Sequence, residues 1–445
     1  MDSSIQLTIF SFISIIVLAV VYFFLITEKV NKVIVAILGA SVLIIAQVFR
    51  SIESSSQENA FNFVSRNLDV LGFVIGMMIL VGIIKESGVF EALAIWLVKV
   101  VRGNPSGLLI VFGYLTLSMT TFLSNIPTVL ILTPVLLVLV KELKLPYLPY
   151  LFIMVAMANI GGAMTPLSDP TTYYQAKTVG LSFVEVISNS GVIVIILSVV
   201  VCAYVLLLFK KQLANISVSS RDVALFQPQK AIKNRRILYL GLPILITAIS
   251  LMILKEYIYT ITGITLDNAT ITLSAAFISM LIFHEEPQIV FKTLIDWEIV
   301  FFFIGLFIIV GGLEFTKVID ILAHSLIELT KGNGVYLLFL ITIATALLSI
   351  FIDNVPLNIT LVGAIQTLAK SGIYVYPLWW ALNLGTSIGG LGSPIAAACN
   401  VIVFSQAQRE NMKVDFKKYL IYALPLVIIN SLITFIILAI RYQYG

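Results

Sequence analysis

The chain has 445 residues, of which 60% are hydrophobic and 11% are charged, and its formal net charge is +4. Soluble domains usually carry about 25% charged residues, so this composition excludes a water-soluble globular protein. It predicts an all-α integral membrane protein, because many apolar stretches reach the ~18–20 residues that cross a bilayer as a helix.

The first apolar stretch, Ile5–Ile26, is long and lacks both a basic N-terminal region and a small-residue cleavage site. It therefore predicts a retained transmembrane helix rather than a cleaved signal peptide. Further along, Glu86–Val101 is apolar but interrupted by charges, which is typical of an amphipathic helix at the membrane interface. The same pattern recurs at Glu314–Leu329, where we expect a second interfacial helix.

The stretch Ser106–Val140 is apolar but has the polar sequence Ser-Asn-Ile-Pro at its middle. The basic residues Lys99 before it and Lys141 after it place both of its ends on the same side of the membrane. We therefore predict a re-entrant hairpin over about residues 106–140, with its tip at Ser124–Thr128. The serine and asparagine of the tip are residue types that cap helices, and proline is tolerated in the first turn of a new helix.

The next apolar helix, over about residues 148–180, contains a polar break at Asn159–Pro170. Paired glycines in this break allow the backbone to unwind, and the Thr-Pro that follows restarts the helix. The sequence therefore predicts a broken helix rather than a continuous span.

The second half of the chain repeats these features in the same order. Asn125 falls on Asn354 at an offset of 354 − 125 = 229, and Gly161 falls on Gly389 at an offset of 389 − 161 = 228. We therefore predict a first repeat over residues 1–215, a linker over 216–236 and a second repeat over 237–445. The matching features of the second repeat are a hairpin over about 336–368 with its tip at Asp353–Thr360, and a broken helix over about 376–404 with its break at Asn383–Pro394.

Loop charges predict the orientation of the two repeats. The region around the linker is rich in basic residues and holds one acid, Asp222; the basic residues are Lys210, Lys211, Arg221, Lys230, Lys233, Arg235 and Arg236. Such an excess is typical of a cytoplasmic loop and not of nucleic-acid binding, so no nucleic-acid partner is expected. Counting spans away from this linker gives the two repeats opposite orientations, each with about five spans and one hairpin.

Polar, helix-breaking sequence at membrane depth is costly unless it lines a cavity or is buried in protein. The two tips and the two breaks would bring up to four half-helix N-termini together near the membrane midplane. Each N-terminus offers free N–H groups and a partial positive charge, while unwound carbonyls offer partial negative charge. This arrangement predicts a site that binds anions and cations together without any lysine or arginine.

Two acids, Asp169 after the first break and Asp353 at the second tip, are candidates for carrying a proton or a cation. A carboxylate at membrane depth is expensive and points to function. The alternative for both is helix capping, because Asp169 precedes Pro-Thr-Thr and Asp353 precedes Asn-Val-Pro. An ionised Asp353 would repel a doubly charged anion, so it favours a cation, a proton or a neutral weak acid in the site.

Four motifs resemble the ion transporter superfamily, and within it the arsenite permease and sodium/proton antiporter branch, which is related to the divalent anion/sodium symporters. They are SNIPTVLILTP and NIGGAMTPLSDP in the first half, and DNVPLNITL and PLWWALNLGTSIGGLGSPIAAACNVI in the second. The resemblance covers nearly the whole chain. It implies an elevator-type carrier, in which a transport domain of hairpins and broken helices slides against a scaffold, and a homodimer. The chain departs from the family pattern at Ser168, at Thr171-Thr172 and at Leu357-Asn358.

The resemblance also implies a set of substrate- and ion-binding residues on the tips and breaks. They are Ser124, Asn125, Thr128, Asn159, Gly161, Gly162, Thr165, Asp169, Asp353, Asn354, Thr386, Gly389, Gly390 and Ser393. Asp353 and Asp169 are the predicted sites of proton or cation coupling. No cofactor and no resident metal is expected, although Na⁺ is a candidate coupling ion at the hairpin tips.

The leading hypothesis is a secondary active transporter for a small anion or oxyanion of the arsenite type, coupled to a proton or sodium gradient. The first alternative is a sodium/proton antiporter. The second is a sodium-coupled dicarboxylate or sulfate symporter, which would require Asp353 to be neutralised. An enzyme is disfavoured because no nucleophile–base pair or metal-ligand set is visible in the sequence. The expected location is the plasma membrane of a prokaryote, with the lipid bilayer and a small ion as partners.

Overall fold

The computed structural model describes residues 9–27, 29–49, 59–214 and 227–443, and within these ranges it contains helices and no strands. This confirms the all-α prediction. By length and composition, eight of the described helices are long and apolar enough to cross a bilayer. The predicted linker falls partly outside the described ranges, as do Arg221 and Asp222, and so does the start of the first apolar stretch.

The helices of the first half, in chain order, are α1 (Ile9–Thr27), α2 (Lys32–Ile45), α3 (Ala60–Ser65), α4 (Leu68–Lys85), α5 (Val89–Val100), α6 (Pro105–Leu123), α7 (Asn125–Glu142), α8 (Tyr147–Gly161), α9 (Pro170–Val179), α10 (Phe183–Val186), the π-helix η1 (Ile187–Gly191), α11 (Val192–Leu208) and α12 (Lys210–Ala214).

Those of the second half are α14 (Pro228–Ala231), α15 (Arg235–Thr262), α16 (Asn268–Phe283), α17 (Pro287–Thr293), α18 (Trp297–Phe315), α19 (Val318–Thr330), α20 (Gly334–Ser349), α21 (Asn354–Lys370), α22 (Tyr376–Gly390), α23 (Ala398–Arg409) and α24 (Phe416–Tyr442).

Each predicted hairpin is a pair of helices joined by a short turn, α6–α7 in the first half and α20–α21 in the second. Each predicted broken helix is two helices separated by irregular backbone, α8 and α9 in the first half and α22 and α23 in the second. The short helices α5 and α19 lie where the charged, apolar stretches predict interfacial helices. Gly, Pro and Asx residues stand at all four of these helix interruptions, and the re-entrant character of the two hairpins stays a prediction.

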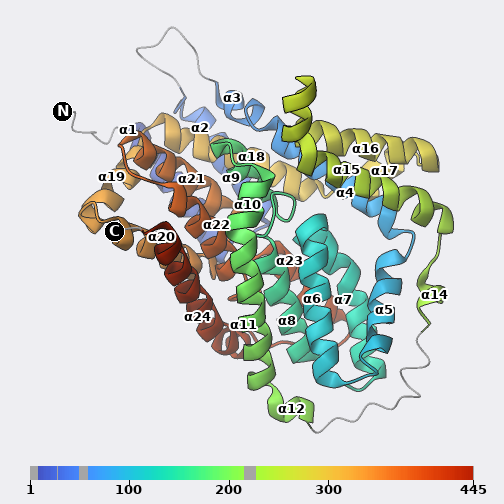
Figure 1. The fold of residues 1–445 in the computed structure, drawn as a ribbon. Coiled ribbons are helices and arrows are strands. Elements are labelled where there is room, and N and C mark those ends of the chain that lie inside the picture. The colour runs from blue at the N-terminus through green and yellow to red at the C-terminus, as the bar shows by residue number, and fades with distance from the viewer. Residues whose placement is uncertain (1–8, 28, 50–58, 215–226, 444–445) are drawn as a thin grey trace.

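The helices fall into two packing groups. Helices α1, α2, α4, α15, α16 and α18 pack against one another, and we call them the outer group. Helices α6 to α11 and α20 to α24 pack mainly against one another, and we call them the hairpin group. Figure 1 shows α15, α16 and α4 side by side at the upper right, with α6, α7 and α8 together below them. The two groups meet where α4 contacts α7 and α9, where α18 contacts α21 and where α15 contacts α10.

Equivalent positions in the two halves occupy equivalent packing environments. In the outer group, Gly76 of α4 lies against Thr272 of α16, and Gly305 of α18 lies against Ala36 of α2. The two contacts correspond between the halves. Gly76 matches Gly305 at an offset of 305 − 76 = 229, and Ala36 matches Thr272 at an offset of 272 − 36 = 236. A side chain at either glycine would collide with the facing helix backbone, so both pairs need the close approach that glycine allows.

Candidate functional site

Both hairpin tips and the starts of both second half-helices line one small cavity of about 30 Å³ between the two packing groups. Its lining residues are Lys32, Asn125, Ile126, Asp169, Pro170, Ile299, Phe302, Phe303, Asp353, Asn354, Val355, Ala397, Ala398 and Cys399. Four residues predicted from the sequence, Asn125, Asp169, Asp353 and Asn354, are therefore brought together although they come from three separate segments.

Asp169 is buried, with 3% of its surface exposed, and it caps the start of α9. Its Oδ1 accepts hydrogen bonds from the Thr171 backbone N–H at 2.8 Å and from the Thr171 hydroxyl at 2.6 Å. Its Oδ2 accepts a hydrogen bond from Asn125 Nδ2 at 2.6 Å, which ties the first tip to the first broken helix. The carboxylate both caps a helix and lines the cavity. The two roles predicted for Asp169, helix capping and binding of a proton or cation, are therefore compatible.

Asp353 caps α21, because its Oδ1 accepts a hydrogen bond from the Val355 backbone N–H at 3.1 Å. Its Oδ2 lies 3.8 Å from Lys32 Nζ, and its side chain is 15% exposed. Asp353 therefore faces a positive charge that comes from the outer group, whereas Asp169 is held by donors of the hairpin group.

Lys32 overturns the prediction of a site without lysine or arginine. It stands at the first position of α2, whose N-cap Asn31 accepts a hydrogen bond from the Val33 backbone N–H. Its Nζ lies 5.1 Å from the centre of the Phe302 ring, which directs the side chain toward the cavity. In the sequence Lys32 is indistinguishable from a loop lysine that anchors a helix end, and the packing of α2 on α18 is what carries it into the site.

The first tip differs from the expected cap. Ser124 has a φ of 72°, and its side chain makes no cap hydrogen bond to α7 among the described residues. Instead, Asn125 Oδ1 accepts from the Ile126 backbone N–H at 2.8 Å, and Thr128 Oγ1 donates to the Ser124 carbonyl at 2.7 Å. A positive φ is strained for a residue with a Cβ, and such strain is often found at functional sites.

Two of the predicted residues, Thr165 and Ser393, fasten the break loops to the hairpins. Thr165 Oγ1 donates to the Thr121 carbonyl at 2.6 Å, and Ser393 Oγ donates to the Ile350 carbonyl at 2.7 Å. The acceptors are equivalent positions, since 350 − 121 = 229. These two hydroxyls do not line the cavity, and their contacts make them part of its frame.

The remaining predicted residues also lie behind the cavity lining. Gly161 packs against α6, Gly389 packs against α20, and Gly390 lies against Asn159 Oδ1. The Thr386 hydroxyl donates to the Leu382 carbonyl within α22.

Sequence reasoning missed a pair of cross-links between the two broken helices. Asn400 Nδ2 donates to the Gly390 carbonyl at 2.7 Å, and Asn400 Oδ1 accepts from Asn159 Nδ2 at 2.7 Å. In the other half, Thr172 Oγ1 donates to the Gly162 carbonyl at 2.7 Å and lies 2.8 Å from Asn383 Oδ1. Each second half-helix thus satisfies a carbonyl of its own break and contacts the other repeat. The signal was a polar residue, Asn400 or Thr172, three positions after the N-cap of each restarted helix.

Two larger hollows flank the cavity. The Asp296 vestibule, about 370 Å³, is lined by Asn31, Asp296, Glu298 and Phe351 among others, and it shares Lys32, Ile126, Ile299, Asp353 and Ala398 with the cavity. Because they share these lining residues, the cavity is continuous with the Asp296 vestibule in this structure. The predicted orientation places this vestibule at the cytoplasmic end.

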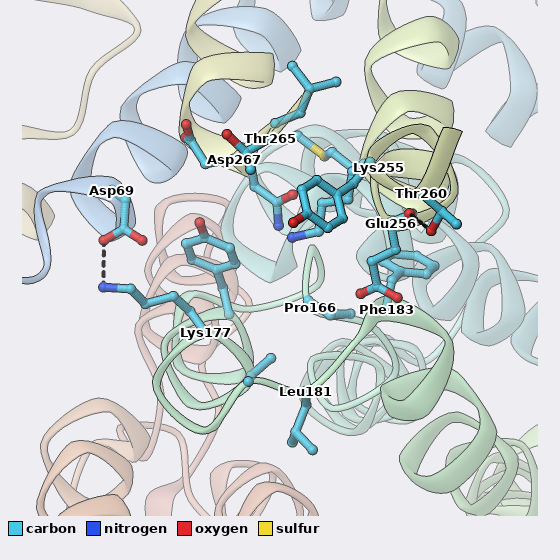
Figure 2. Close-up of a pocket in the computed structure, with 17 residues that line it drawn as sticks. Asp69, Pro166, Lys177, Leu181, Phe183, Lys255, Glu256, Thr260, Thr265 and Asp267 are labelled. Carbon is cyan, nitrogen blue, oxygen red and sulfur yellow. Dashed lines mark hydrogen bonds and ion pairs between the residues drawn. The ribbon is translucent and has the colours of Figure 1, made fainter. Parts of the chain in front are cut away.

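The Asp69 vestibule, about 530 Å³, is drawn in Figure 2, and the predicted orientation places it at the end opposite the Asp296 vestibule. Among the described residues, it shares none of its lining with the cavity. Figure 2 shows the ion pair between Asp69 of α4 and Lys177 of α9, 3.0 Å apart, on the side opposite Glu256. The Phe73 ring lies 4.2 Å from the Tyr173 ring between the same two helices, so these contacts close the outer group onto the hairpin group.

Asp267, which caps α16, lines the Asp69 vestibule. Burial acts to raise the pKa of Asp267, but hydrogen bonds from the hydroxyl and the backbone N–H of Thr270 outweigh it. The pKa of Asp267 therefore lies below its usual value, and the carboxylate stays ionised at neutral pH.

The profile of the citrate transporter family matches residues 22–385. The chain is 29% identical to the "46 kDa membrane protein" of Mycobacterium leprae over 437 residues, covering 97% of this chain and 99% of that protein. It is 28% identical to an uncharacterized transporter of Mycobacterium tuberculosis, covering 92% of this chain and 93% of that one. The crystal structure of the YdaH transporter of Alcanivorax borkumensis resembles the chain with a TM-score of 0.60 at 16% identity, over 89% of this chain and 91% of that one.

Proposed function

The chain belongs to the citrate transporter family, and on that premise we propose that this secondary transporter moves a small anion or oxyanion of the arsenite type, coupled to a proton or sodium gradient. The observation that carries the proposal is the cavity in which Asp169, Asp353 and Lys32 meet two asparagines and the N-termini of α9 and α21. The arsenite permease and antiporter branch remains a prediction within this family.

The charges of the cavity support coupling. With both aspartates and Lys32 ionised, the charge is −2 + 1 = −1, so an anion alone would enter a site of its own sign. A proton or a sodium ion on a carboxylate removes this repulsion and makes binding of the anion favourable. A neutral weak acid would not meet the repulsion at all. Cation binding and substrate binding therefore support each other.

The size of the cavity favours a small substrate. About 30 Å³ accommodates a single small ion, and any larger substrate would have to extend into the Asp296 vestibule. An oxyanion would extend less far than a tricarboxylate, which is why we prefer it. The sodium-coupled dicarboxylate or sulfate symporter is the further alternative, and the ammonium group of Lys32 is the observation in its favour.

The mechanism that we propose is an elevator-type motion of the hairpin group against the outer group. Support comes from the sparse packing between the groups and from the equivalent helix contacts of the two halves, which are expected for inverted repeats. In transporters with such repeats, access alternates between the two sides when one bundle of helices moves against the other. We further propose a homodimer in the plasma membrane of a prokaryote, with the outer group as the scaffold.

A sodium/proton antiporter is the second candidate function. Two carboxylates, Asp169 and Asp353, line a cavity small enough for a single cation, with asparagine oxygens close by. Exchange of Na⁺ for H⁺ on these carboxylates would need no anion.

The test uses purified protein in liposomes that contain a pH-sensitive dye. Saturable proton movement on addition of arsenite or antimonite, under an imposed proton gradient, is the expected result. Proton movement driven by a Na⁺ gradient without any transportable anion would establish the antiporter instead. If neither appears, sulfate and citrate are added with Na⁺, and transport of either would replace the oxyanion in the proposal.

A further inference from the structure

We infer that Lys32 is a state-dependent counter-ion of Asp353, which displaces the coupling cation from that carboxylate when the cavity opens to the Asp296 vestibule. This inference rests on the proposed cation coupling and goes beyond it by assigning the step at which the cation is released. It concerns a lysine for which the sequence motifs predicted no role.

The surroundings of Asp353 show that one cation competes for its carboxylate. Of the described residues that line the cavity, Lys32 alone is basic, and its Nζ lies 3.8 Å from Asp353 Oδ2. Asp169 and the Cys399 thiol face the same cavity, and Asp296 and Glu298 line the adjoining vestibule. A cation that binds Asp353 in this state must therefore do so beside an ammonium group, whose charge repels it.

The two partners belong to different packing groups. Lys32 is at the start of α2, which packs on α18 and α1 in the outer group. Asp353 is at the start of α21, which packs on α22 and α9 in the hairpin group. Any sliding of one group along the other therefore changes the distance between Lys32 Nζ and the Asp353 carboxylate.

The other half of the molecule shows what the pair becomes after such a movement. Lys32 corresponds to Asn268, since 268 − 32 = 236, the offset of the Ala36–Thr272 match. Asp353 corresponds to Ser124, since 353 − 124 = 229. Asn268 lines the Asp69 vestibule, and among the described lining residues of that vestibule no tip residue is present.

If the two halves exchange conformations, Lys32 is placed relative to Asp353 as Asn268 is now placed relative to Ser124. Lys32 is then separated from Asp353. The carboxylate then faces the opposite vestibule without its lysine, so a cation binds there more tightly. The return movement brings Lys32 back and releases the cation into the Asp296 vestibule. The pair thus makes cation affinity different in the two states, which favours release of the cation into the Asp296 vestibule.

The experiment compares Lys32→Met with the unaltered chain in everted and in right-side-out membrane vesicles from the same cells. The probes are protons and NaCl, varied on the exposed face, and the readout is the concentration that gives half-maximal dye-reported flux. On the cytoplasmic face, exposed in everted vesicles, we expect this concentration to fall by roughly tenfold, as removal of a charge this close shifts affinity. On the external face we expect it to stay within about twofold, because Lys32 is then distant from Asp353.

Two variants separate this role from a structural one. Lys32→Arg keeps the charge and should restore the wild-type half-maximal concentration on the cytoplasmic face. Lys29→Met removes an exposed positive charge from the same loop and should change neither face.

Equal changes on both faces, or a raised substrate KM with unchanged cation dependence, would show that Lys32 binds substrate or supports the fold, and would overturn the inference. Absence of any cation-driven flux in the unaltered chain is a different result. It would overturn the proposed function, and the inference with it.

Discussion

The cavity has two corners, each made of a hairpin tip and the neighbouring break, and they differ in chemistry although both breaks end with the same backbone conformation. The residue before α9, Asp169, has φ −154° and ψ 140°, and the residue before α23, Ala397, has φ −144° and ψ 149°. They are equivalent positions, since 397 − 169 = 228, yet one is a carboxylate and the other a methyl group. At the tips the order is reversed, with Ser124 in the first half and Asp353 in the second.

Each corner therefore has one carboxylate, which stands at the break in the first half and at the tip in the second half. In the first corner, Asp169 receives three hydrogen bonds from Thr171 and Asn125, all within the hairpin group. In the second, Asp353 receives one from its own helix and faces Lys32 across the interface between the groups. In the proposed sliding motion the first carboxylate moves together with its partners, whereas the second changes partners. The proposal therefore gives cation exchange to Asp353 and a fixed charge to Asp169.

The largest effect is expected at the second corner. Asp353→Asn keeps the size and the cap acceptor of the side chain but removes the charge that binds the cation. We expect coupled transport to be lost while the protein still inserts and folds, as measured by flux in liposomes and by size-exclusion chromatography. Wild-type flux in this variant would reduce Asp353 to a helix cap.

At the first corner, Asp169→Asn should impair transport by disturbing the tip. The new amide must present an N–H₂ group to Thr171 or to Asn125 Nδ2, and two donors cannot bond each other. We expect a lower melting temperature and a flux reduced by about tenfold or more, since a buried polar contact is lost. The exchange variant Asp169→Asn with Asn125→Asp restores one donor and one acceptor and should recover the melting temperature. No recovery would mean that the position of the charge, rather than the hydrogen bond, holds the tip.

The local features of this architecture could be predicted from the sequence, whereas the contacts that depend on the packing of distant segments could not. Glycine pairs, X-Pro steps and Asx residues marked both tips and both breaks, because these residues act on the backbone beside them. Lys32 reaches the cavity because α2 packs closely on Gly305 of α18, a contact between distant segments that no local pattern contains. Asn400 was missed for the same reason, since its partner Asn159 lies in the other half of the chain.

The sharpest way to test the difference between the corners is to convert one into the other. Asp353→Ser with Ala397→Asp gives the second corner the chemistry of the first. Relative to Asp353→Ser alone, we expect the pair to regain cation-dependent thermal stabilisation by Na⁺ or protons, because the cavity again has two carboxylates, one at each corner. Flux should remain below wild type by several-fold, because the carboxylate no longer stands at the tip that meets Lys32. Full recovery of flux would show that the corner on which the charge stands is unimportant.

The smallest effects are expected where the two halves use the same contact. Thr165→Val and Ser393→Ala each remove a hydroxyl that donates to a buried hairpin carbonyl, at 2.6 Å to Thr121 and at 2.7 Å to Ile350. An unpaired buried carbonyl costs about 1–3 kcal/mol, so each variant should lower the melting temperature by a few degrees. The two donated hydrogen bonds are equivalent, but Thr165 Oγ1 also accepts a hydrogen bond from the Leu167 backbone N–H at 3.2 Å, so Thr165→Val should lose more stability than Ser393→Ala. The two losses should add in the double variant, since the sites share no partner. Equal losses at the two sites would show that the hydrogen bond from Leu167 adds nothing measurable to the stability of the first break.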